Sequence, residues 1–175
     1  MLTEAVRDVP ATASIFGFFA SMWFGWAQES PPAKWRPWLL TGSVTSLLTM
    51  VAGALLTWRN WDATTAFDED TSKTFGIVIG LEVLLAGAGA VVLGLRGRRE
   101  LVPVWIALVV GLHLFPVAAL LAFPLIHLVG ALVTIGALVA VPVARSRTLP
   151  VSAVNGLAVG GVLLTAALVC LLAAL

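Results

Sequence analysis

The stretch that most constrains the fold of this chain is a long charge-free region, residues 101–144. No Asp, Glu, Lys or Arg lies between Glu100 and Arg145, and the apolar run is broken only briefly, by Leu-Ala-Phe-Pro124. The segment on each side of this break is close to the ~20 apolar residues that a helix needs to cross about 30 Å of hydrocarbon. The stretch therefore predicts a hairpin of two membrane-spanning helices.

The composition of the whole chain points the same way. It is 60% hydrophobic and only 11% charged, with a mean hydropathy of +1.04, whereas soluble domains hold roughly 25% charged residues. The net charge of +1 provides no electrostatic reason to expect nucleic acid as a partner. A single cysteine, Cys170, excludes an internal disulfide and a thiolate metal cluster. We therefore expect a lipid bilayer as the surroundings, and neither a cofactor nor a metal.

Six apolar segments can be counted along the chain. They cover approximately residues 11–27, 37–58, 75–95, 101–122, 125–143 and 151–174. The first segment is the shortest and lies at the lower limit of spanning length. The pattern predicts an all-α fold, a polytopic integral membrane protein in which a single domain, residues 1–175, forms a six-helix transmembrane bundle.

The basic residues indicate how such a bundle would be oriented. On alternating sides of six spans, seven of the ten Lys and Arg residues fall on one side: Lys34, Arg36, Arg96, Arg98, Arg99, Arg145 and Arg147. Cytoplasmic loops carry the excess of Lys and Arg in membrane proteins, so we expect both termini outside. Arginine outnumbers lysine in a background rich in Ala, Gly, Val and Leu, which favours a bacterial plasma (inner) membrane.

Ionisable residues inside the predicted spans are candidates for function, because they are costly to place in lipid. Glu82 lies about 12 Å inward from Thr74, and His113 about 13 Å inward from Ala122, at 1.5 Å per helical residue. Since these two spans are antiparallel neighbours, we expect the carboxyl and the imidazole at nearly equal depth. Such a pair could relay protons, hold a cationic substrate or simply fasten two helices together.

Four further polar residues are candidates. His127 lies roughly 12 Å in depth from His113, too far for both to ligate one haem iron. Asn155, near the cytoplasmic end of the last span, is expected to bond a neighbouring helix. Thr45 and Thr49 share a face of the second span, where their hydroxyls could line a polar path or bond back to their own helix.

Other features predict packing. Small residues at helical spacing, among them Gly76 with Gly80 and Gly156 with Gly160, indicate close helix contacts. Trp105 falls at a predicted cytoplasmic end, where tryptophan typically anchors a span at the membrane interface.

The central hairpin resembles that of a group of uncharacterised bacterial multi-pass membrane proteins. The similarity rests on Val110-Gly-Leu-His113-Leu-Phe-Pro116-Val-Ala, followed by Phe123-Pro124-Leu-Ile-His127-Leu-Val-Gly130-Ala. The pattern of the group runs Gly-Leu-His-Phe-x-Pro-x-Ala, then Pro, then Tyr-Tyr-x-x-Gly. This chain departs from it at Ala119, where the group often carries a basic residue, and at Ile126-His127, which replace the tyrosines. The resemblance implies a helix hairpin and singles out His113, but it implies no activity.

These observations favour a small-solute or proton-linked transporter or channel-like protein with an intramembrane Glu82/His113 site. Two alternatives remain: a non-catalytic membrane scaffold or accessory subunit, and an intramembrane lipid-modifying enzyme. One histidine and one glutamate are too few for a standard catalytic constellation, so we do not expect an enzyme. The expected partners are the lipid bilayer, a small molecule or proton as substrate, and a homo-oligomer or a membrane protein.

Overall fold

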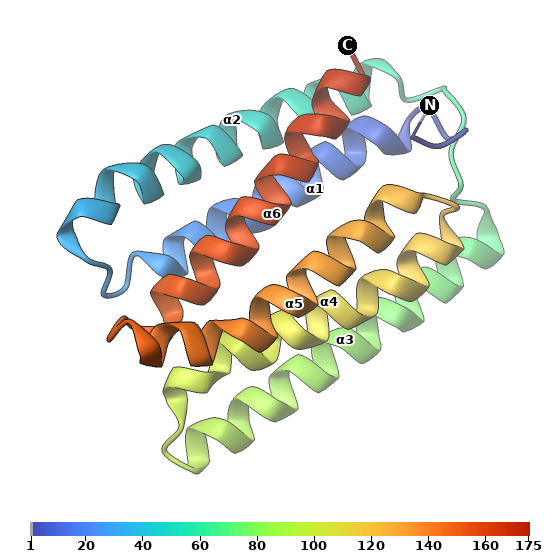
Figure 1. Cartoon of the computed structure of the whole chain (residues 1–175). Helices are drawn as coiled ribbons and strands as arrows, with labels where there is room; N and C mark the ends of the chain where they lie inside the picture. Colours follow the sequence, from blue (N-terminus) through green and yellow to red (C-terminus); the bar gives the residue numbers. More distant parts are fainter. Residues whose placement is uncertain (1) are drawn as a thin grey trace.

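The structure, a computed structural model, describes residues 2–175, and this part of the chain is all-helical (Figure 1). The six long helices are α1 (Asp8–Ala27), α2 (Arg36–Arg59), α3 (Glu69–Leu95), α4 (Val102–Leu120), α5 (Pro124–Ser146) and α6 (Val151–Ala173). Short 3₁₀ turns, η1 (Ala33–Trp35) and η2 (Arg99–Leu101), precede α2 and α4. The predicted all-α fold is confirmed.

Four of the six helices, α1, α2, α3 and α5, begin earlier than the apolar segments that identified them. Helix α3 begins at Glu69 rather than at residue 75, because the Asp68 carboxylate accepts a hydrogen bond from the Thr71 N–H at 2.7 Å and caps the helix. The acidic residues Glu69 and Asp70 therefore form its first turn, where they face the positive end of the helix dipole. Hydropathy marks the part of a helix that can lie in lipid, but not where the helix ends.

Three of the connections begin with a left-handed residue that ends a helix sharply. Gly97, Ala122 and Thr148 have φ values of +70°, +48° and +53°. In each case the next residue donates its N–H to a carbonyl five positions back: Arg98 to Leu93, Phe123 to Ala118 and Leu149 to Ala144. These are Schellman motifs, and they let α3, α4 and α5 reverse direction within a few residues.

Five of the six helices are long and apolar enough to cross a membrane. These spans are Ala33–Arg59, Glu69–Leu95, Arg99–Leu120, Pro124–Ser146 and Val151–Ala173. Helix α1 does not reach that apolarity, so the predicted sixth span lacks this support; its serines, Thr12 and tryptophans lower its hydropathy. Eleven of its 20 residues are nevertheless buried, whereas no residue of α3 is buried.

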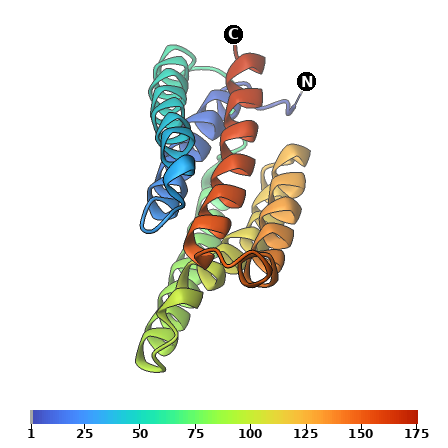
Figure 2. The ribbon, with the colours of Figure 1, turned by 60° about the vertical axis from the view of Figure 1, so that its left-hand side comes forward.

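The helices form two groups of three. Helix α1 packs against α2 and α6, and α4 packs against α3 and α5 (Figures 1 and 2). Helix α6 joins the groups through α5 and through part of α4. Within residues 2–175, the Cα atoms of α1 stay more than 8 Å from those of α3 and α4. Both termini lie at the same end of the bundle (Figures 1 and 2).

Glycines allow the close helix contacts inside each group. A Cβ on Gly17 of α1 would lie 2.8 Å from the backbone N of Met50 and the backbone O of Ser46, both on α2. A Cβ on Gly156 of α6 would lie 2.6 Å from the carbonyl oxygen of Trp23 on α1. The backbones can approach this closely only because these side chains are missing.

The predicted small-residue contacts are therefore correct for one pair and wrong for another. Gly156 and Gly160 both face α1, as their spacing predicts, with Gly160 against the Phe24 ring. Gly76 and Gly80 of α3 face open space within the described chain. Spacing identifies a smooth helix face but not which neighbour, if any, lies against it.

Candidate functional site

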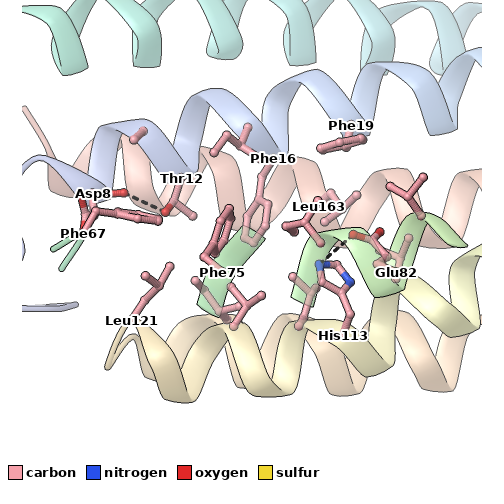
Figure 3. Close-up of a pocket in the computed structure, with 18 of the residues that line it drawn as sticks. Asp8, Thr12, Phe16, Phe19, Phe67, Phe75, Glu82, His113, Leu121 and Leu163 are labelled. Carbon is pink, nitrogen blue, oxygen red and sulfur yellow. Dashed lines mark hydrogen bonds and ion pairs between the residues drawn. The ribbon is translucent and has the colours of Figure 1, made fainter. Parts of the chain in front are cut away.

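A cleft lies where α1 is held away from the pair formed by α3 and α4 (Figure 3). Its volume is about 460 Å³. Most of its lining is apolar, and five of the lining side chains are aromatic: Phe16, Phe19, Trp23, Phe67 and Phe75. Leu163 of α6 and Ile126 of α5, both almost fully buried, also line it. The cleft follows directly from the separation of the two helix groups.

Glu82 and His113 meet in the wall of this cleft (Figure 3). The His113 Nε2 lies 3.3 Å from the Glu82 Oε2, and the two side chains are only 13% and 17% exposed. Their predicted equal depth is therefore found as direct contact between α3 and α4. At this distance one proton can lie between the two atoms, donated either by the carboxyl O–H or by the imidazole Nε2–H. When the Nδ1 atom also carries a proton, the pair is neutral overall in both arrangements.

The second nitrogen of His113 remains without a partner. Its Nδ1 is buried and makes no hydrogen bond to any described residue. A lone buried ring nitrogen costs free energy unless a ligand or a water satisfies it. Because this nitrogen is buried, it does not itself face the open space of the cleft.

A second polar pair, Asp8 and Thr12 of α1, lines the other end of the cleft (Figure 3). The buried Asp8 carboxylate accepts hydrogen bonds from the Thr65 hydroxyl and the Ala66 N–H, both at 2.8 Å. The Thr12 hydroxyl donates to the Asp8 carbonyl at 2.7 Å. These bonds fix the loop between α2 and α3 and so place Phe67 in the wall of the cleft.

Arg7, just before α1, makes further contacts with the loop between α2 and α3. The Arg7 N–H donates to the Thr64 carbonyl at 3.0 Å, and its guanidinium donates to the Trp61 carbonyl at 3.0 Å. That guanidinium also lies 4.9 Å from the Trp61 ring centre, a cation–π contact. The loop between α2 and α3 is therefore anchored to the start of α1.

Sequence reasoning missed Asp8 and Thr12. The available signal was a carboxylate immediately before an apolar segment, a position typical of a helix N-terminus. Its partners, Thr65 and Ala66, are more than fifty residues away in the sequence. No local pattern joins residues at that separation.

The other predicted candidates lie outside the cleft. His127 is exposed on α5, with its ring 6.0 Å from that of Phe115. Asn155 is fully buried and donates to the Pro103 carbonyl at 3.1 Å, which joins α6 to α4 as expected. The Thr49 hydroxyl donates to the Thr45 carbonyl at 2.9 Å, so it bonds back to its own helix. None of the four residues lines the cleft that contains Glu82 and His113.

Trp105 does more than anchor a span. Its indole N–H donates to the Leu85 carbonyl on α3 at 3.0 Å. The ring occupies the space that a side chain at position 89 would need, because a Cβ on Gly89 would overlap it. Trp105 and the Glu82–His113 contact are the two polar links between α3 and α4 that the described residues contain.

Residues 2–175 contain no group of three or more His, Cys, Asp or Glu side chains placed to hold a metal ion. Comparison with known proteins found no matching protein-family model, no matching curated protein and no matching solved structure. The cleft and its polar groups are therefore the features of this chain that bear on its function.

Proposed function

We propose that this protein is a proton-linked carrier of a small solute, in which the cleft binds the solute and the Glu82–His113 pair holds the exchangeable proton. One observation carries the proposal: a carboxyl and an imidazole in contact at 3.3 Å line a cavity of about 460 Å³. A pair that merely joined two helices would not need an adjoining cavity. Intramembrane pairs of this kind are typical of proton relays in transporters.

The proposal places all six helices across a bacterial plasma membrane, with both termini outside. Helix α1 is less apolar than the other five, but α2 and α6 cover much of it. A helix covered by protein can carry serine, threonine and a buried carboxylate without exposing them to lipid. The location of both termini at one end of the bundle agrees with an even number of crossings (Figure 1).

Proton flux into liposomes tests the carrier directly. Purified wild type, Glu82→Gln and His113→Ala would be reconstituted with a pH-sensitive dye inside, and an imposed pH gradient would be followed as it decays. We expect flux in the wild type and its loss in both variants, because each variant removes one of the two groups that share the proton.

Matched controls separate the site from a general effect of substitution. Glu100→Gln alters an exposed carboxylate, and His127→Ala alters an exposed imidazole outside the cleft; both should retain wild-type flux. Equal flux in all five proteins would contradict the proposal. So would protein-free rates in every sample, provided that the wild type is folded.

A second candidate function is that of a scaffold or accessory subunit. It is favoured by α3, which has no buried residue and is held to the bundle mainly through α4. In this case Glu82 and His113 would fasten α3 to α4 and carry no proton. The scaffold predicts reduced stability in both variants with no proton flux in any sample, so the same experiment distinguishes the two.

A further inference from the structure

The cleft opens at the side of the helix bundle, between the segments that the proposal places in the membrane. Ile15 and Phe19 of α1 and Val83 of α3 line the cleft, yet they are 50%, 47% and 63% exposed. We call these three residues the mouth of the cleft. Val83 directly follows Glu82, so the mouth lies at the depth of the proton-holding pair. A solute that enters here comes from the hydrocarbon of the bilayer rather than from water.

The charges of the lining select against anions. The lining contains two carboxyl groups, Asp8 and Glu82, and one imidazole, His113, whereas no Lys or Arg lines it in the described chain. The Asp8 carboxylate is bonded only to uncharged donors. Nothing permanently positive therefore balances these carboxyl groups, which makes the cleft suitable for a cation.

The aromatic lining favours the same class of solute. Phe16 and Phe19 of α1 lie across the cleft from Phe75 and Glu82 of α3 (Figure 3), and Trp23 of α1 also lines it. Aromatic faces attract cations, most strongly where water is excluded. Both Asp8 carboxylate oxygens already accept hydrogen bonds, from Thr65 and Ala66, so Glu82 is the carboxyl group left to pair with a solute. An apolar wall with aromatic faces and this one carboxyl group is complementary to a molecule that is largely apolar and carries a single positive charge.

From these contacts we infer that the solute is a lipophilic monocation, an amine or quaternary centre on an apolar body, that reaches Glu82 through the mouth from the bilayer. This inference rests on the proposed carrier function. Binding replaces one proton by one positive charge: the O–H bond of the neutral carboxyl breaks, the proton leaves to solvent, and the cation pairs with the carboxylate. The charge of the cleft is unchanged, which avoids placing an unpaired ion among apolar side chains.

Two ions of the same shape and opposite charge test the inference. Equilibrium dialysis would measure tetraphenylphosphonium and tetraphenylborate binding to the full chain in nanodiscs, with empty nanodiscs subtracted. We expect saturable binding of the phosphonium, tightening as the pH rises because protons compete for Glu82. Binding of the borate should not exceed that of empty nanodiscs. Asp8 and His113 are the other titratable groups that line the cleft, so Asp8→Asn should retain the pH dependence that Glu82→Gln removes.

Two variants locate the bound cation. Glu82→Gln should weaken phosphonium binding about tenfold or more, because it removes the carboxylate whose charge attracts the cation in apolar surroundings. Val83→Trp should obstruct the mouth and weaken binding while leaving Glu82 in place. Val91→Trp is its matched control, since Val91 lies on the same helix outside the cleft and is similarly exposed, at 61%.

The outcomes separate this inference from the carrier function on which it rests. Phosphonium binding that requires Glu82, without proton flux even in liposomes that also contain phosphonium, would support the cation site and contradict the carrier. Proton flux that requires Glu82, without phosphonium binding, would overturn the lipophilic cation and leave the carrier intact. Equal binding of both ions, or binding unaffected by Glu82→Gln and Val83→Trp, would also overturn it.

Discussion

At the scale of single residues, the free energy of the site depends on how its polar groups are partnered. Glu82 and His113 are both largely shielded, and each is the other's only side-chain partner in the described chain. Removal of one therefore leaves the other unpaired in apolar surroundings. A buried group that loses its partner costs about 1–3 kcal/mol.

We expect His113→Ala to lower the free energy of unfolding of the detergent-solubilised protein by about 1–3 kcal/mol. His127→Ala is the matched control, because it deletes an exposed imidazole that makes no hydrogen bond. Thermal melts of both variants against the wild type would measure the difference. Identical melting of His113→Ala and His127→Ala would show that the Glu82–His113 contact does not stabilise the fold.

The stability of the start of α3 should depend on pH through Asp68, which lies outside the apolar spans. The Thr71 backbone N–H, together with its side chain, lowers the pKa of the Asp68 carboxyl below its ordinary value of 3.8. Because the pKa is lower when folded, this cap stabilises the start of α3 fully above pH 3.8 and is lost as the pH falls through the folded value.

Hydrogen exchange at the Thr71 amide measures that loss. We expect protection to decrease, relative to residues in the middle of α3, as the pH falls below 3.8. Asp68→Asn is the matched control: it retains an oxygen acceptor but does not titrate, so its relative protection should not vary over the same range. Parallel behaviour of wild type and variant would exclude the carboxylate as the cause.

The sequence allowed Glu82 and His113 to be predicted for a simple reason. Ionisable residues are conspicuous in apolar spans, and the rise of a helix converts residue number into depth. Asp8 could not be found this way, because its partners belong to a loop distant in sequence. The cleft itself was equally hidden, since it arises from the separation of α1 from α3, which no local pattern encodes.

At the scale of helices, apolarity alone does not predict burial. Helix α3 is apolar enough to span a membrane and has no buried residue, whereas α1 does not reach that apolarity and is extensively buried. Lipid requires an apolar surface, while neighbouring helices accept small and polar residues. Hydropathy therefore identified the five helices that are long and apolar enough to cross a membrane, and it gave the weakest signal for the helix that packs against both α2 and α6.

Close packing of α1 can be tested with two glycines of that helix. Gly17→Ala would place a Cβ 2.8 Å from backbone atoms of α2, which cannot rotate away. We expect a loss of about 1–3 kcal/mol from this overpacking. Gly25→Ala meets nothing within 4 Å and should lie within about 1 kcal/mol of the wild type, on the stabilising side. Equal melting of the two variants would contradict the tight contact between α1 and α2.

At the scale of the whole molecule, the contacts of the N-terminal segment fix which ends of the helices lie together. The Arg7 N–H bonds the Thr64 carbonyl at 3.0 Å, so residues near position 4 and position 62 lie on one side of the bundle. Lys34 and Arg98 belong to the connections at the opposite helix ends. If α1 crosses the membrane with the other five helices, positions 4 and 62 must lie on one side of the membrane, and positions 34 and 98 on the other.

Cysteine labelling of intact cells tests that arrangement. Single cysteines at Glu4, Asp62, Lys34 and Arg98 would be introduced in a Cys170→Ala background and treated with a membrane-impermeant maleimide. We expect labelling at positions 4 and 62 in intact cells, and at positions 34 and 98 only after permeabilisation, because basic loops remain in the cytoplasm. The reverse pattern would invert the proposed orientation. Labelling of positions 4 and 34 from the same side would remove α1 from the membrane, and with it the bilayer-facing mouth that Ile15 and Phe19 form with Val83.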